Sequence, residues 1–291
     1  MDDETRQAYF RAVEDPRSRR LVEKLEPFLE WVSKYYFRCS FAGWERVPDG
    51  KVLFVGNHNG LITWEVPMMY HAWHQRFGMQ RPALGLAHEG MFHLPVDPAL
   101  VPRLGAIPAD KQMALDAFER GYSLLVFPGG EKEAFRTYKE RKKIDFFERK
   151  GFIRLALEAH VPIVPIVSIG AHESYVIMHR GEMLAERLGL RKRFRLHGVP
   201  LTLGSFFFLG LFASGLLLLF PFLVPPLALS MLVPLPTKMH FELLPCVDLH
   251  ARYRSTLSRE GNVQRIYDEI VASMQSTLSQ GYAERLLPIF G

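Results

Sequence analysis

Short apolar runs alternate with helix-forming stretches through the first 170 residues, and this alternation limits the possible folds more than any other feature. The runs that we predict to be strands are residues 51–56, 82–87, 123–127 and 163–169. The stretches that we predict to be helices are residues 65–77, 110–120 and 150–160. Strands that alternate with helices in this way indicate an α/β fold, in which helices flank a mostly parallel sheet.

The first 40 residues are expected to form an amphipathic helical segment. Asp15 and Pro16 suit the N-cap and first position of a helix, and apolar residues recur at helical spacing from Leu21 to Tyr36. Basic residues crowd the beginning of this helix, so it either packs on the core or lies on anionic lipid. The acidic, polar N-terminus does not resemble a signal or transit peptide.

No charged residue occurs from Val199 to Thr237. A membrane span needs roughly 20 unbroken apolar residues, and only Leu201 to Phe220 approaches that length before prolines interrupt it. Basic residues flank the segment on both sides, which favours a hairpin that enters the membrane and returns to the cytoplasmic face. A true span and a buried core element remain open alternatives.

Composition excludes several classes of protein. The 291 residues, 48% of them hydrophobic, are enough for the core of one α/β domain. The net charge of +5 suits an anionic membrane, a phosphorylated cofactor or nucleic acid, but the basic residues form no recognisable nucleic-acid module. Cys39 and Cys246 lack metal-type spacing and are expected to be reduced thiols of a cytosolic compartment.

A histidine follows the first predicted strand directly, in the block Gly56-Asn57-His58-Asn59-Gly60. The carboxyl end of such a strand is where open α/β sheets bind ligands, and the glycines leave the ring accessible. Imidazole can take a proton from an alcohol near neutral pH. Glu65, at the start of the next helix, can return to hold the ring, as in other base–carboxylate pairs.

Three further blocks follow in order: Leu104–Lys111, Val126–Ala134 and Val161–Ile166. With the histidine block, they resemble the lysophospholipid acyltransferase (PlsC-like) superfamily from about Gly43 to Ile169. Phe-Pro-Gly-Gly followed by Glu133-Ala134 is most similar to the branch of diacylglycerol acyltransferases and phytyl ester synthases. The resemblance implies a PlsC-like fold with an apolar membrane-associated insertion.

The resemblance also implies transfer of a fatty acyl group from acyl-CoA, or acyl carrier protein, to a lipid hydroxyl. Such a transfer is expected to need neither a metal nor a cofactor beyond acyl-CoA as co-substrate. His58 is then the catalytic base, and Glu65 replaces the usual acid partner, because the fifth residue after His58 is Thr63. We expect the backbone N–H groups of Gly129 and Gly130 to stabilise the oxyanion. The residues expected to bind substrate are Lys111, Glu131, Lys132, Glu133 and Arg136.

The acceptor is expected to be a neutral lipid, such as diacylglycerol or a long-chain alcohol. Relatives that use phosphorylated acceptors commonly carry Glu and Arg where this chain has Gly129 and Lys132. Glu131 and Glu133 would also repel a phosphate. The alternatives are a lysophospholipid or glycerophosphate acyltransferase, and a non-catalytic lipid-binding protein of the same fold. A serine esterase is not expected, since Gly-x-Ser-x-Gly is absent.

These predictions divide the chain into four parts. Residues 1–40 form the N-terminal helical segment, and residues 41–198 form the acyltransferase core. Residues 199–236 are the membrane-associated segment, which holds the protein at the cytoplasmic face. Residues 237–291 complete the core with a strand at 239–244 and a helix capped by Asn262.

Overall fold

The computed structural model describes most of the chain but leaves part of the apolar segment undescribed. The described residues are 1–60, 63–93, 97–191, 197–206, 233–253, 256, 258–285 and 287. The prediction for residues 199–236 therefore lies largely outside the described residues, as do the basic residues Lys192, Arg193 and Arg195 that precede the segment.

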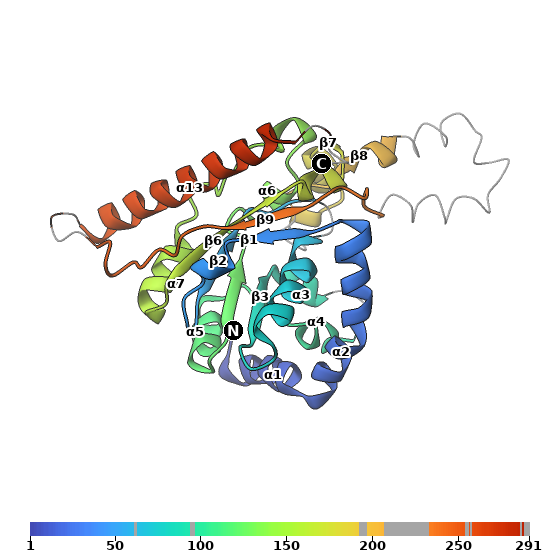
Figure 1. The fold of residues 1–291 in the computed structure, drawn as a ribbon. Coiled ribbons are helices and arrows are strands. Elements are labelled where there is room, and N and C mark those ends of the chain that lie inside the picture. Colours follow the sequence, from blue (N-terminus) through green and yellow to red (C-terminus); the bar gives the residue numbers. More distant parts are fainter. Residues whose placement is uncertain are drawn as a thin grey trace.

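The centre of the molecule is a seven-stranded sheet of order β1-β9-β6-β2-β5-β3-β4 (Figure 1). Five neighbouring strands, from β6 to β4, are parallel, whereas β9 runs antiparallel to β6 and parallel to β1. The strands are β1 (Ser40–Ala42), β2 (Leu53–Gly56), β3 (Ala83–Ala87), β4 (Ala106–Pro108), β5 (Ser123–Val126), β6 (Ile163–Ile169) and β9 (His240–Leu243). The expected mostly parallel sheet is thus confirmed.

Burial explains which strands were predictable. Every residue of β2 and β6 is buried, because helices cover both faces of the sheet there, so these strands are continuous apolar runs. In contrast, β1 and β4 have three residues each and were missed. A run that short shows no periodicity, and only pairing with a neighbouring strand makes it part of the sheet.

The longer helices agree with the predicted pattern. Asp15 caps α2 with its side chain, as expected from the sequence, and Asp110 does the same for α5. The principal helices are α1 (Asp3–Glu14), α2 (Pro16–Trp31), α3 (Glu65–Phe77), α5 (Lys111–Glu119), α7 (Gly151–Ala159) and α13 (Arg259–Ala283). The shorter ones are α4 (Leu100–Arg103), α6 (Gly130–Ala134) and α8 (Glu182–Arg187). The N-terminal segment thus contains two helices, followed by a π-helical turn at Val32–Tyr36.

The predicted cap of the last helix was wrong. Ser258, not Asn262, caps α13, and its hydroxyl accepts a hydrogen bond from the N–H of Gly261. Asn262 lies buried in the first turn, and its side-chain amide donates to the carbonyl of Ser258. Both residue types suit a cap, so only the backbone conformation distinguishes them.

Two apolar clusters cover the two faces of the sheet. One cluster includes residues of α5, α7 and α13, and the other includes residues of α3 and the beginning of the π-helical turn after α2. Figure 1 shows α13 along one side of the sheet and α2 and α3 toward the other. Within the described part of the chain, no helix is long and apolar enough to cross a membrane.

A small second sheet, β7 (Ile177–His179) with β8 (Leu201–Thr202), lies where the apolar segment begins. The N–H of Leu203 donates to the carbonyl of Val176, and that of Leu235 donates to the carbonyl of Ser174. Residues on either side of the undescribed stretch 207–232 are therefore attached to the same short part of the chain, residues 174–176.

Candidate active site

The loop that follows β2 carries His58 at the carboxyl edge of the sheet. Because β2 lies between β5 and β6, this loop emerges near the middle of the sheet. Two buried asparagines attach it to β6. Asn57 exchanges hydrogen bonds with both backbone groups of Ser168, at 2.8 and 3.0 Å, and Asn59 donates to the Ser168 hydroxyl at 2.6 Å. Residue types alone did not indicate this role for the two asparagines.

His58 and Glu65 lie together, as predicted. The Nδ1 of His58 is 3.1 Å from the Oε1 of Glu65, which also accepts the N–H of Asn59 at 2.7 Å. The Glu65 side chain is only 2% exposed, whereas that of His58 is 17% exposed. A buried carboxylate therefore holds one ring nitrogen of an imidazole that still reaches the surface.

An aromatic ring packs against His58. The rings of Phe127 and His58 are stacked, with centroids 4.8 Å apart and planes at 23°. Gly56 makes room for this contact, since a Cβ there would lie 2.7 Å from the Phe127 ring. Phe127 and Gly56 belong to blocks that the sequence singled out, but only the fold shows that one leaves space for the other.

Two residues expected to bind substrate lie in the interior. Glu133 is 0% exposed and Arg136 is 1% exposed, and their side chains form an ion pair at 3.3 Å. Burial raises the pKa of Glu133, although the neighbouring Arg136 guanidinium opposes this shift. Their hydrogen-bond partners include both backbone groups of His58: the N–H donates to Glu133, and the carbonyl accepts from Arg136. The structure therefore places them behind the loop that carries His58, away from solvent.

Gly130 and Glu131, two further predicted site residues, are also occupied by protein groups. The N–H of Gly130 donates to the carbonyl of Phe127 at 3.0 Å, so in this state it is not free for an oxyanion. The Glu131 carboxylate accepts from the backbone N–H of His197 at 2.9 Å and contacts its ring. Gly129 is the N-cap of α6, and its N–H has no acceptor among the described residues.

The two predicted lysines differ in position. Lys132 is exposed on α6 and lies over the ring of Phe147. Lys111 forms an ion pair with Glu158 at 2.8 Å, beside a surface cavity of about 560 Å³ that Val126 also lines. Because consecutive strand residues point to opposite faces, Val126 faces away from Phe127 and His58. The structure thus does not bring Lys111 together with His58.

Three further histidines are hydrogen-bonded to other protein groups. His71 and His74 share the carboxylate of Glu26, at 2.5 and 3.2 Å. The buried His172 lies 2.9 Å from the carbonyl of Arg136, and burial lowers its pKa to about 3. Within the described ranges, no group of three or more His, Cys, Asp or Glu side chains is arranged to hold a metal ion.

Comparison with known proteins agrees with the sequence pattern. Residues 38–169 match the family model described as "Acyltransferase". An uncharacterized protein of Mycobacterium tuberculosis is 32% identical over 167 residues, which are 57% of this chain and 47% of that protein. The Gallus gallus "DGAT1/2-independent enzyme synthesizing storage lipids" is 29% identical over 131 residues, 45% of this chain and 38% of that enzyme.

Two further comparisons concern phospholipid synthesis. A "1-acyl-sn-glycerol-3-phosphate acyltransferase" of Limnanthes douglasii is 27% identical over 160 residues, 52% of this chain and 48% of that enzyme. The chain thus spans about half, or less, of the length of these curated relatives. The crystal structure of PlsC from Thermotoga maritima, a 1-acyl-sn-glycerophosphate acyltransferase, superimposes with a TM-score of 0.51 at 15% identity. This superposition covers 92% of this chain and 86% of that one, and it shows a shared fold.

Proposed function

We propose, from the premise that the chain belongs to the PlsC-like acyltransferase family through residues 38–169, that it is an O-acyltransferase acting on a lipid hydroxyl. The single observation that carries the proposal is the contact between His58 and the buried Glu65 at 3.1 Å. The Nδ1 of His58 is engaged by the Glu65 carboxylate, which leaves Nε2 of the partly exposed ring to meet a substrate. This is the arrangement that a general base needs.

In the proposed reaction, the acceptor hydroxyl attacks the carbonyl carbon of a thioester, either acyl-CoA or acyl carrier protein. His58 takes the hydroxyl proton on Nε2 as the C–O bond forms, and Glu65 stabilises the imidazolium. The tetrahedral intermediate collapses by breaking the C–S bond, and the leaving thiolate receives the proton from His58. The N–H of Gly129 is the remaining candidate of the two glycine donors for the oxyanion, because that of Gly130 is bonded to Phe127.

We further propose a neutral acceptor, such as diacylglycerol or a long-chain alcohol. Glu133 contributes little repulsion toward a phosphate, because its charge is paired with that of Arg136. The guanidinium of Arg136 is buried on protein groups and cannot reach a phosphate in this state. Lys111 is exposed but paired with Glu158, which leaves Lys132 as the exposed cation without an ion pair to a described residue among the predicted substrate-binding residues.

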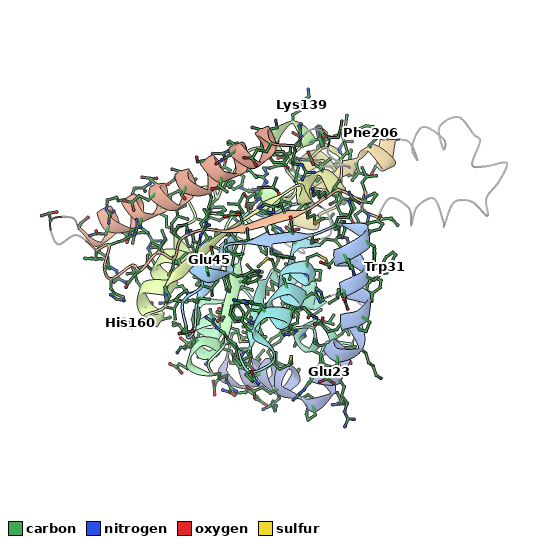
Figure 2. The ribbon with its side chains drawn as sticks, viewed as in Figure 1. Glu23, Trp31, Glu45, Lys139, His160 and Phe206 are labelled. Atoms are coloured by element: carbon green, nitrogen blue, oxygen red, sulfur yellow. The ribbon has the colours of Figure 1, made fainter. Side chains whose placement is uncertain are left out.

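The protein is proposed to work at the cytoplasmic face of a membrane, where such acceptors reside. Exposed apolar side chains occur on both sides of the undescribed stretch, at Leu203, Phe206, Val233 and Leu235. Trp31 on α2 adds to this group of exposed apolar side chains. Its ring lies beside that of Tyr36, and the Tyr36 hydroxyl donates to the carbonyl of Pro234. Figure 2 shows Trp31 and Phe206 at the outside of the molecule. Exposed apolar groups gathered in this way are typical of a membrane or protein interface.

A competition assay tests the proposed function. The protein, solubilised in detergent, receives one labelled acyl-CoA with diacylglycerol, a fatty alcohol, lysophosphatidate and glycerol 3-phosphate together. We expect the label in neutral ester, with release of one free thiol for each ester formed. Label in phosphatidate would instead favour the phosphorylated acceptor, which the named function of the Limnanthes relative makes the second candidate. Absence of thiol release with acyl-CoA, and with acyl carrier protein in its place, would support the non-catalytic alternative.

A further inference from the structure

The segment Val126–Arg136 contains two deeply buried charges near the site. Glu133 and Arg136 are both at most 1% exposed, yet they come from a segment whose exposed members, such as Lys132, are ordinary surface residues. Taking two charges out of water is costly unless their hydrogen bonds are well satisfied inside the protein. The partners of this pair therefore indicate what it is retained for.

Two of those partners are the backbone groups of one residue, His58. The Oε2 of Glu133 accepts the N–H of His58 at 3.1 Å, and the Nη2 of Arg136 donates to the carbonyl of His58 at 3.3 Å. The same Nη2 also donates to the Oδ1 of Asn59 at 3.2 Å. Both backbone groups of His58 are thus held by one buried ion pair, while Glu65 holds its ring.

The glycine before α6 has a role that follows from this arrangement. Gly129 has φ −64°, which any residue can adopt, so its conformation does not require glycine. However, a Cβ at Gly129 would lie 2.2 Å from the Oε2 of Glu133 and 2.4 Å from its Cβ. Glycine at this position therefore gives the Glu133 side chain the room to reach the N–H of His58.

We propose that Glu133 and Arg136 are positioning residues, which fix the backbone of His58 for general-base catalysis, and that Gly129 is required to admit Glu133. This inference rests on the proposed acyltransferase function. The pair touches no substrate, so its loss lowers kcat and leaves KM nearly unchanged. Displacing a catalytic group by about 1 Å can cost about 100-fold in rate, so a loss of about 10- to 100-fold in kcat is expected.

Two variants with one matched control test the proposal. Gly129→Ala places a methyl group against Glu133, whereas Gly151→Ala, with no atom within 4 Å of its added Cβ, is an unstrained control in α7. Glu133→Gln keeps the shape of the side chain but removes the charge. We expect Gly129→Ala and Glu133→Gln each to lower kcat by about 10- to 100-fold, with KM for donor and acceptor within about twofold of the parent and Gly151→Ala unchanged.

A second readout is independent of turnover. The backbone N–H of His58 should exchange slowly with solvent in the parent protein, and faster in Gly129→Ala and Glu133→Gln, as measured by amide exchange in NMR. A purely structural pair would change the melting temperature without selectively releasing this one amide. If Glu133→Gln does not fold, Arg136→Lys replaces it, because lysine keeps the charge but not the planar fork.

The outcomes separate this inference from the proposed function. Folded variants with normal kcat, or with a raised KM and normal kcat, would overturn the positioning role while leaving the acyltransferase proposal intact. If the parent transfers no acyl group to any acceptor, the proposed function fails. Unchanged exchange of the His58 amide in the variants would then overturn the inference about the buried pair as well.

Discussion

At the scale of single residues, the proposed site depends on a base, His58, and its partner seven positions later, Glu65. The separation exceeds the usual spacing of the family's catalytic pair, and Thr63 cannot act as the acid. The structure nevertheless brings Nδ1 of His58 to 3.1 Å from Glu65, because α3 begins at Glu65 and returns its side chain toward the loop. Residue types predicted this pair, whereas the asparagines that hold the loop were not recognisable without β6.

The first prediction concerns this pair. His58→Ala should fold normally and lower acyl transfer by at least about 1000-fold, since a lost general base commonly costs about 100- to 10,000-fold. Glu65→Gln should have a milder effect, because glutamine can still hydrogen-bond the ring but carries no charge. Steady-state kinetics of the two variants provide the measurement. Near-normal turnover in His58→Ala would reject the mechanism, and a silent Glu65→Gln would mean that another carboxylate orients the ring.

The second prediction concerns acid stability. The folded protein keeps the pKa of His172 at about 3, below its ordinary value of 6.5, because the ring is buried and lies near Arg136. The unfolded chain binds this proton below about pH 6.5, so the stability contributed by the neutral ring is present above that pH. It is lost as the pH falls toward 3, at a rate of up to about 1.4 kcal/mol per pH unit.

His172→Gln should remove this contribution to the pH dependence, since its amide can still donate to the Arg136 carbonyl and does not titrate. Urea unfolding of both proteins at pH 7, 5.5 and 4.5 measures the effect. We expect the stability of the parent to fall more steeply with acid than that of His172→Gln. Parallel pH profiles would show that His172 does not contribute.

At the scale of secondary structure elements, α2 and α3 are joined by a shared carboxylate. Glu26 of α2 contacts the Nδ1 atoms of His71 and His74 on α3, at 2.5 and 3.2 Å, and both rings are largely buried. The sequence showed the two histidines one turn apart, but it did not show their partner, which lies more than 40 residues away. Since α3 also carries Glu65, this connection supports the helix whose first residue holds the proposed base, His58.

The third prediction tests this connection. Glu26→Ala leaves two buried imidazoles without their acceptor, and it should lower the free energy of unfolding by about 1–3 kcal/mol. Glu23→Ala on the same helix removes an exposed ion pair with Arg19 and serves as the matched control. That change should cost less than about 1 kcal/mol. Urea unfolding at neutral pH measures both, and equal losses would contradict the role of Glu26.

At the scale of the whole molecule, one end carries exposed apolar residues beside an uncharged segment. The backbone N–H groups of residues 203 and 235 donate to the carbonyls of residues 176 and 174. These two acceptors are close in sequence to the buried His172 and Glu173. Acyl donors and lipid acceptors are themselves amphiphilic. A lipid-facing surface at this end would therefore let substrates reach the protein from the membrane rather than through water.

The fourth prediction follows from this surface. The intact protein should float with lipid vesicles in a density gradient, because a long uncharged segment is unfavourable in water. Removing residues 203–232 should shift the protein to the soluble fraction, with circular dichroism showing whether the core remains folded. An intact chain that stays at the bottom of the gradient, as a detergent-free monomer, would favour a buried role for the segment.

The sequence by itself determined the longer strands and helices of the core, the resemblance to acyltransferases, and the proposed pair of His58 and Glu65, but not the short strands β1 and β4. Long buried strands and capped helices leave local patterns, and a candidate pair close in the chain can be found by residue type. Only the tertiary structure decided where the charged residues of the segment Val126–Arg136 lie. Glu133 and Arg136 have the composition of a substrate-binding loop, and local sequence does not record burial. Their interior position arises because α6 packs behind the β2 loop, with space left by Gly129, and it directs both charges to the backbone of His58.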